Sequence, residues 1–224
     1  MNLQLYHYAG NNPVKYTDPD GRFLNFVIGA AIGFVTSTAS EVGARMIQGQ
    51  SFSDAVNNTF SDNTSLAVIC ASTAIGSVTS GVSGLAVNAA TKSVTTAASL
   101  GTKTGVQAIT EIAITTTAIN TISGAVDAGA KDVAVKVLKG EEQSVTDTAK
   151  VIGNGALSAA LFSGATQGII ASGTTATGQI GNVLTGSMKE FKMNQPQWAG
   201  SVGNFGENIL PTGYDIYKSI KGEE

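Results

Sequence analysis

The sequence predicts a mainly α-helical protein that begins with a short β-hairpin and continues as Gly/Ala-rich helical hairpins. Only 13% of its 224 residues are charged, against about 25% in a typical soluble domain, and 27 residues are glycine. Long charge-free runs separate short charged stretches. Within these runs, large aliphatic residues recur every three or four positions, which is the period of an α-helix.

The composition also argues against several classes of function. The net charge is −3, and no cluster of basic residues marks a surface for nucleic acid. His7 is the only histidine and Cys70 the only cysteine, so a Cys/His metal site and an intrachain disulfide are excluded. Cys70 lies in a charge-free run, where we expect a buried, inert thiol. We therefore expect no metal, no cofactor and no nucleic-acid partner.

Residues 1–22 form the first predicted segment. Residues 3–8 are rich in aromatics and predict a strand, and the GNNP sequence that follows predicts a turn. Residues 14–17 predict a second strand, which runs into the turn sequence DPDG at residues 18–21. The segment is therefore expected to be a β-hairpin, a structure that is only marginally stable by itself.

The strings NL, LYHY, NNPV and DPDG within residues 2–21 resemble the last segment of the Rhs (YD-repeat) associated core domain. In Rhs proteins the repeats wind into a β-cocoon, and a variable C-terminal cassette follows the motif, commonly a toxin used against neighbouring bacteria. The resemblance implies that the chain from Arg22 onward is such a cassette. Its implied partners are the cocoon shell or parent protein and a cognate immunity protein.

The resemblance also bears on localisation and self-cleavage. Met1 begins no signal peptide, so we expect secretion through a carrier system or a surface location within a larger Rhs protein, and a cytoplasmic chain if it is expressed alone. The family cleaves itself through paired aspartates, and Asp18 and Asp20 lie in the downstream element. The upstream element would precede Met1, and Arg22 replaces the usual Leu. We therefore expect Asp18 to cap a turn and no self-cleavage in the isolated chain.

Residues 23–192 are expected to form a helical domain rich in Gly, Ala, Ser and Thr. Residues 23–40 carry no charge and contain Gly29 and Gly33 in a G-x-x-x-G pair, which makes them the best membrane-spanning candidate. A buried core helix explains this stretch equally well. Two longer charge-free runs follow at residues 63–91 and 151–188. The second run contains few large hydrophobic residues and many small or uncharged polar ones.

Three apolar seams mark the helices of this domain, and small residues accompany the third. Each set is expected to form one apolar stripe along a helix, while small faces let backbones approach in tight hairpins. The small residues assigned to helix packing or to a membrane are Gly29, Gly33, Gly164 and Gly168. The seams consist of Ile75, Val78, Val82 and Leu85; of Ile109, Ile112, Thr116, Ile119 and Val126; and of Ile152, Leu157, Leu161, Ile169 and Ile170, with Ala156 and Ala160 beside them.

A weak internal repeat links residues 41–54 with residues 132–147. In each copy an amphipathic segment ends at a Gly, and Ser/Thr followed by Asp then opens the next helix. This pattern predicts a duplicated unit of a helix, a short loop and a longer charge-poor helix. Glu41 with Arg45, and Lys131 and Asp132 with Lys136, have helical spacings and are expected to form solvated ion pairs.

Residues 193–224 are expected to be a loop-rich tail. Our first interpretation of the whole chain is a non-enzymatic cassette of an Rhs-type polymorphic toxin, which acts in interbacterial competition as a helical packing, translocation or membrane-interacting module. The alternatives are an enzymatic toxin (nuclease, transferase or glycohydrolase) and an inactive orphan tip. The enzyme would have to draw on Glu190, Trp198, Glu207, Tyr214, Asp215 and Tyr217, whose spacing matches no mechanism.

Overall fold

The computed structural model describes residues 22–176 and Ser201, and all of its regular structure is helical. The five helices are α1 (Arg22–Ile47), α2 (Phe52–Ser61), α3 (Asn63–Ser99), α4 (Gly105–Lys139) and α5 (Val145–Ala176). The prediction of a mainly α fold is confirmed for this part of the chain. The predicted N-terminal hairpin and the tail fall outside the described residues, apart from Ser201.

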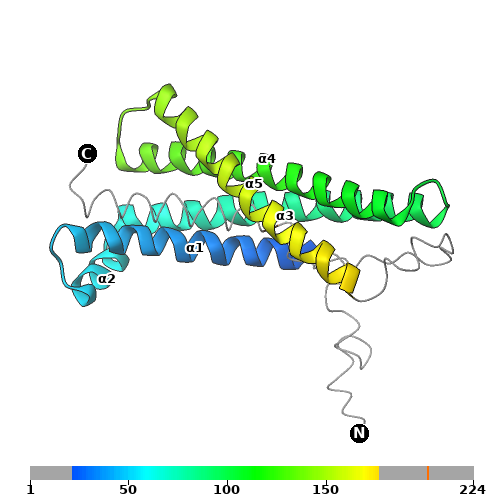
Figure 1. Ribbon diagram of the computed structural model, residues 1–224. Coiled ribbons are helices and arrows are strands. Elements are labelled where there is room, and N and C mark those ends of the chain that lie inside the picture. Colours follow the sequence, from blue (N-terminus) through cyan, green and yellow to red (C-terminus); the bar gives the residue numbers. More distant parts are fainter. Residues whose placement is uncertain (1–21, 177–200, 202–224) are drawn as a thin grey trace, which may run out of the picture.

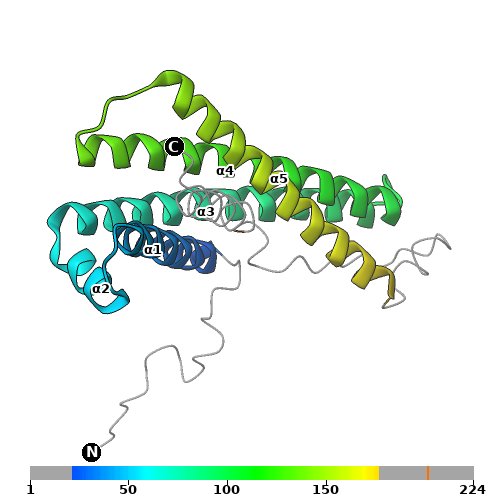
Figure 2. The ribbon, with the colours of Figure 1, turned by 60° about the vertical axis from the view of Figure 1, so that its left-hand side comes forward.

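The long helices form a row in which each packs against the next. α1 lies against α3, α3 against α4, and α4 against α5, while the short α2 joins α1 to α3 (Figure 1). α5 crosses α4 obliquely in both views (Figures 1 and 2). The α1–α2 turn and the α4–α5 loop lie at the same end of the molecule. We call this the charged end, because Glu41, Arg45, Asp62 and Lys139 gather there.

Small residues set the distance between α1 and α3. A Cβ atom added at Gly29 would overlap the carbonyl oxygen of Gly76, and one added at Gly33 would overlap that of Ser72. The approach is reciprocal, since a Cβ at Gly76 would come within 2.6 Å of the Gly29 carbonyl oxygen. Only glycine permits such close contact between two helix backbones. The G-x-x-x-G pair of α1 therefore lies in the interface with α3.

The two copies of the internal repeat form the same local structure. α1 and α4 end near glycines with left-handed backbone conformation, Gly49 with φ of +90° and Gly140 with φ of +69°. Ser51 and Ser144 then cap the next helices, each accepting a hydrogen bond from the backbone N–H three residues on, at 3.2 and 3.3 Å.

The copies diverge after the cap. In the first copy, Asp62 interrupts the helix after ten residues and caps α3 by accepting from the N–H groups of Thr64 and Ser65. The second copy continues as the single helix α5. Asp is a poor residue inside a helix and a good one at its start, which explains why α2 and α3 are separate helices.

Candidate functional site: an apolar outer surface around a polar interior

The aliphatic seams of α3 and α5 lie on the outside of the molecule. Val78 and Val82 are 57% and 58% exposed on α3, and Leu157 and Leu161 are 61% and 59% exposed on α5. Most members of these two seams therefore do not line the interior between the helices. The seam of α4 is divided: Ile109, Ile112 and Thr116 are buried, whereas Val126 is exposed.

The apolar surface follows the charge-free runs of all four long helices. Val78, Val82, Ile122 and Val126 line one shared groove between α3 and α4, and a monomer in water rarely exposes a large contiguous apolar patch. The exposed members within the runs are Phe23, Val27, Phe34 and Val35 on α1; Val78, Val82 and Leu85 on α3; Ile114, Ile122 and Val126 on α4; and Ile152, Leu157, Leu161 and Ile169 on α5. We call this set the apolar belt.

The interior between the helices is largely polar and small. One buried aliphatic cluster lies where Val94 and Ala98 of α3 meet Ala108, Ile109 and Ile112 of α4, and Val42, Val68, Ile69 and Val87 are buried as well. Elsewhere the buried side chains include hydroxyls and amides from all four long helices. These polar residues are Asn25, Ser72, Ser80, Ser83, Thr116, Asn120, Ser158, Ser163 and Gln167.

Hydrogen bonds across the interfaces join some of these polar groups, whereas the hydroxyls of Ser80 and Thr116 have no hydrogen-bond partner among the described residues. The Asn120 amide donates to the Ser163 hydroxyl at 2.9 Å, which connects α4 with α5. Ser201, the one residue described beyond α5, donates to the Asn25 side-chain oxygen at 2.9 Å. A buried polar group that lacks a partner costs about 1–3 kcal/mol, so such bonds fix how the helices are paired.

An ion pair lies within this polar interior. Asp127 is fully buried, and its carboxylate lies 2.6 Å from the ammonium of Lys131, one turn along α4. The Thr79 hydroxyl of α3 donates to the same carboxylate at 2.7 Å. The sequence analysis did not single out Asp127, although its spacing of four from Lys131 was a usable signal.

At the charged end, the ion pairs in the structure differ from those that helical spacing predicts. Glu41 pairs with Lys139 of α4 at 2.6 Å, and its carboxylate lies 3.0 Å from the hydroxyl oxygen of Ser65, whose hydrogen points to Asp62 at 2.8 Å. Arg45 pairs with Asp62 at 2.9 Å. The expected Glu41–Arg45 pair is therefore replaced by contacts to α3 and α4. The expected Asp132–Lys136 pair is present at 2.7 Å, but both side chains are largely buried and not solvated.

Hydrogen bonds lower the pKa of two aspartates that open helices. The Ser65 hydroxyl and the backbone N–H groups of Ser65 and Thr64, with Arg45 nearby, lower the pKa of Asp62 below its ordinary value. Lys150 and the Ser144 hydroxyl lower the pKa of Asp147 in the same way. Both carboxylates are therefore ionised at neutral pH, which suits the cap of α3 and the first turn of α5, each at the positive end of its helix.

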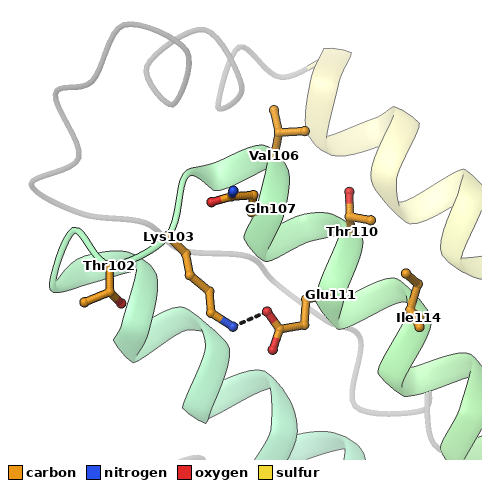
Figure 3. A pocket seen from close by; sticks show the side chains of 7 residues that line it. All are labelled: Thr102, Lys103, Val106, Gln107, Thr110, Glu111 and Ile114. Carbon is orange, nitrogen blue, oxygen red and sulfur yellow. Dashed lines mark hydrogen bonds and ion pairs between the residues drawn. The ribbon is translucent and has the colours of Figure 1, made fainter.

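A wide depression lies beside the first turns of α4 (Figure 3), and the α3–α4 connection beside it lies at the end opposite the charged end (Figure 1). Its volume is about 610 Å³, and an ion pair between Lys103 and Glu111 crosses its wall. Val106 and Ile114 supply much of the remaining lining, and neither histidine nor cysteine is present. The two charged groups pair with each other, and Thr102 and Thr110 add hydroxyls to the lining.

The described residues contain no group of three or more His, Cys, Asp or Glu that could hold a metal ion. Cys70 is exposed on α3, so the expectation that it is buried was wrong. The candidate aspartates Asp18 and Asp20 lie outside the described residues. So do the six residues of the enzymatic alternative: Glu190, Trp198, Glu207, Tyr214, Asp215 and Tyr217.

The two predicted glycine pairs have different environments. Gly29 and Gly33 are buried against α3, whereas Gly164 and Gly168 lie on the exposed side of α5, where an added Cβ would meet no atom within 4 Å. Ser163 precedes Gly164 and Gln167 precedes Gly168, and both of these polar residues lie on the buried face of α5. The two glycines therefore lie on the outward face. Within the described chain they do not bring two helices together.

Two described segments, Phe23–Ile47 of α1 and Asn63–Ser99 of α3, are long enough and apolar enough to cross a membrane. Only 17% of the most apolar window of the first segment and 39% of that of the second are buried. The core helix of a water-soluble protein would be mostly buried. The described part of the charge-free run of α5, residues 151–176, contains several glycines and threonines and is not among these candidates.

No protein family, curated protein or solved structure matches the chain. The physical arrangement of its own residues must therefore support any account of its function.

Proposed function

We propose that the chain is a non-enzymatic, membrane-inserting module that acts in interbacterial competition as the C-terminal cassette of an Rhs-type polymorphic toxin. The observation that carries the membrane part of this proposal is the placement of residues. Many large aliphatic side chains of the charge-free runs face outward, while hydroxyls, amides and the Asp127–Lys131 pair share the interior with a few aliphatic residues. The N-terminal motif supplies the toxin context.

The placement suits a lipid environment because lipid chains are as apolar as Leu and give no reason to bury aliphatic side chains. Helices in a bilayer associate through small residues and interhelical hydrogen bonds. Gly29 with Gly76, and Asn120 with Ser163, are contacts of these two kinds. Ionisable residues within membrane helices normally pair inside the bundle, as Asp127 and Lys131 do.

Helix length supports the same proposal. About twenty residues of α-helix cross the hydrocarbon core of a bilayer, and α1 and α3 have 26 and 37 residues. They run antiparallel, since Asn25 near the start of α1 approaches Gly84, and Glu41 near its end contacts Ser65. A pair of this kind can insert as one hairpin, with its connecting helix α2 left at the charged end.

Dye release from liposomes tests this proposal. The purified full chain at micromolar concentration is expected to release an encapsulated dye, and the chain directed to the periplasm of a bacterial host is expected to depolarise the inner membrane. If liposomes stay intact at both neutral and acidic pH, the membrane proposal is wrong. If cells die while their membranes stay polarised, the enzymatic alternative replaces it.

A second candidate is a module packed inside the cocoon of its parent protein. Several apolar side chains outside the charge-free runs favour this candidate, because a bilayer that covers the apolar belt would leave them in water. They include Phe52 on α2, which is 67% exposed, and Val145 at the start of α5, which is 87% exposed. Both candidates would be excluded if the chain is monomeric and helical in detergent-free buffer and does not act on liposomes. Such a chain would need neither a bilayer nor a cocoon to cover its apolar side chains.

A further inference from the structure

A small polar pocket lies where α1, α3 and α4 meet at the charged end. Its volume is about 190 Å³, room for about six water molecules at ~30 Å³ each. The α1 wall contains Thr36, Ser37 and Glu41, and the α4 wall contains Lys131 and Lys139. None of these residues belongs to the apolar belt.

The α1 wall presents hydrogen-bond acceptors. Ser37 donates its hydroxyl hydrogen to the Gly33 carbonyl at 2.6 Å, and Thr36 donates to the Ile32 carbonyl at 2.7 Å. A hydroxyl has one hydrogen, so an oxygen engaged in this way offers only lone pairs to a ligand. The carboxylate of Glu41 likewise accepts and does not donate.

The α4 wall presents donors. Lys131 and Lys139 each carry an ammonium group with three N–H donors. Lys139 lies 2.6 Å from Glu41, and Lys131 lies 2.6 Å from Asp127, which does not line the pocket. These two ion pairs balance in charge, so a simple anion or cation gains little net attraction here. A ligand that carries both charges can satisfy both walls at once.

We propose that this pocket binds a small zwitterion of the phosphoethanolamine type. Its primary ammonium donates to Glu41 and to the Ser37 oxygen, and its phosphate accepts from Lys131 and Lys139. Such a group exists free in solution and as the head group of a phospholipid. The charge-free run of α1 ends at Glu41, so the proposed function would place the pocket at head-group level. The choice of the lipid source rests on that proposed function, but the pocket chemistry does not.

Calorimetric titration of the full chain in detergent with O-phosphoethanolamine tests the chemistry. We expect saturable binding that is at least tenfold weaker for phosphocholine, whose quaternary ammonium has no N–H, and for inorganic phosphate. Glu41→Gln removes the negative wall, and Val135→Phe fills the pocket from α4. Each change should weaken binding at least tenfold. Lys150→Gln, at an exposed ion pair of the charged end, is the matched control and should leave binding unchanged.

A second arm distinguishes the two sources. Flotation with phosphatidylethanolamine vesicles, compared with phosphatidylcholine vesicles, should show a preference that Val135→Phe abolishes. Equal flotation together with soluble binding would assign the free zwitterion as the ligand.

The proposal is overturned if O-phosphoethanolamine gives no saturable binding. It is also overturned if both pocket variants keep wild-type affinity and wild-type helix content by circular dichroism. Dye release measured in parallel keeps the two proposals separate, because a chain that releases dye and binds no zwitterion contradicts the pocket alone.

Discussion

The hydroxyl of Thr79 on α3 donates a hydrogen bond of 2.7 Å to the fully buried carboxylate of Asp127 on α4. Because Lys131 lies 2.6 Å from the same carboxylate, three polar groups from two helices meet where a water-soluble bundle would place aliphatic residues. Hydrogen-bonded groups of this kind fix the register of neighbouring helices, which apolar contacts between similar surfaces specify poorly.

Breaking this buried pair should destabilise the protein strongly. Asp127→Ala leaves the Lys131 ammonium without its carboxylate, and loss of one partner of a buried ion pair costs about 3–5 kcal/mol. Thermal unfolding of the full chain in detergent, followed by circular dichroism, measures this cost. Asp127→Leu combined with Lys131→Met should recover most of the lost stability. The control Lys150→Ala breaks an exposed pair and should cost about 0–1 kcal/mol. A cost below 1 kcal/mol for Asp127→Ala would contradict the structure.

The α1–α3 interface should reject any side chain at Gly29. Gly29→Leu would place side-chain atoms against the Gly76 backbone, and overpacking of this kind costs about 1–3 kcal/mol or more. Gly164→Leu is the matched control on the exposed side of α5. It should be neutral or stabilising by up to ~1 kcal/mol, because Leu is the better helix former. Equal effects of the two substitutions on the unfolding temperature would show that α1 and α3 do not approach as described.

The cap of α3 should make stability depend on pH. The folded-state pKa of Asp62 is lowered below its ordinary 3.8, mainly by the Ser65 hydroxyl, so the ionised cap is present above the unfolded pKa. Its contribution should be lost as the pH falls below 3.8 and through the folded pKa. Asp62→Ala should therefore lower the unfolding temperature at pH 7 and have less effect near pH 2. A difference between the two proteins that does not change with pH would contradict this role.

The apolar belt should be intolerant of charge in a membrane assay. Val82→Asp places a carboxylate in the middle of the charge-free run of α3, where insertion experiments give a cost of about 2.5–3.5 kcal/mol. Dye release should fall, while solubility without detergent should rise. Val145→Asp is exposed outside the belt and should leave dye release unchanged. If the two variants behave alike, the belt has no special relation to lipid.

Helix type was predictable from the sequence because a period of three to four residues does not depend on the surroundings. The usual rule that an apolar stripe faces the interior did not predict the direction of each apolar stripe. Val78 and Val82 share one face of α3, and periodicity alone cannot tell whether that face meets a helix or the surroundings. The neighbouring small residues, Ser72, Gly76 and Ser80, were the signal that the opposite face packs.

The pairing of charges was predicted less well, because helical spacing reports only contacts within one helix. Glu41 and Arg45 are four residues apart and suit a local pair. In the folded chain, Lys139 of α4 and Asp62 before α3 attract them to separate partners. Such long-range contacts depend on how the helices are arranged, which no local pattern encodes.

Cys70 offers the most direct measurement of whether the belt enters a bilayer. It is the only cysteine, it is exposed, and it lies in the charge-free run of α3, eight residues from Asp62. A polarity-sensitive fluorophore attached to this thiol should shift to the blue and brighten when vesicles are added, and lipids that carry a nitroxide in their acyl chains should quench it. Emission that stays water-like and unquenched, while the chain is bound to vesicles, would contradict insertion of α3.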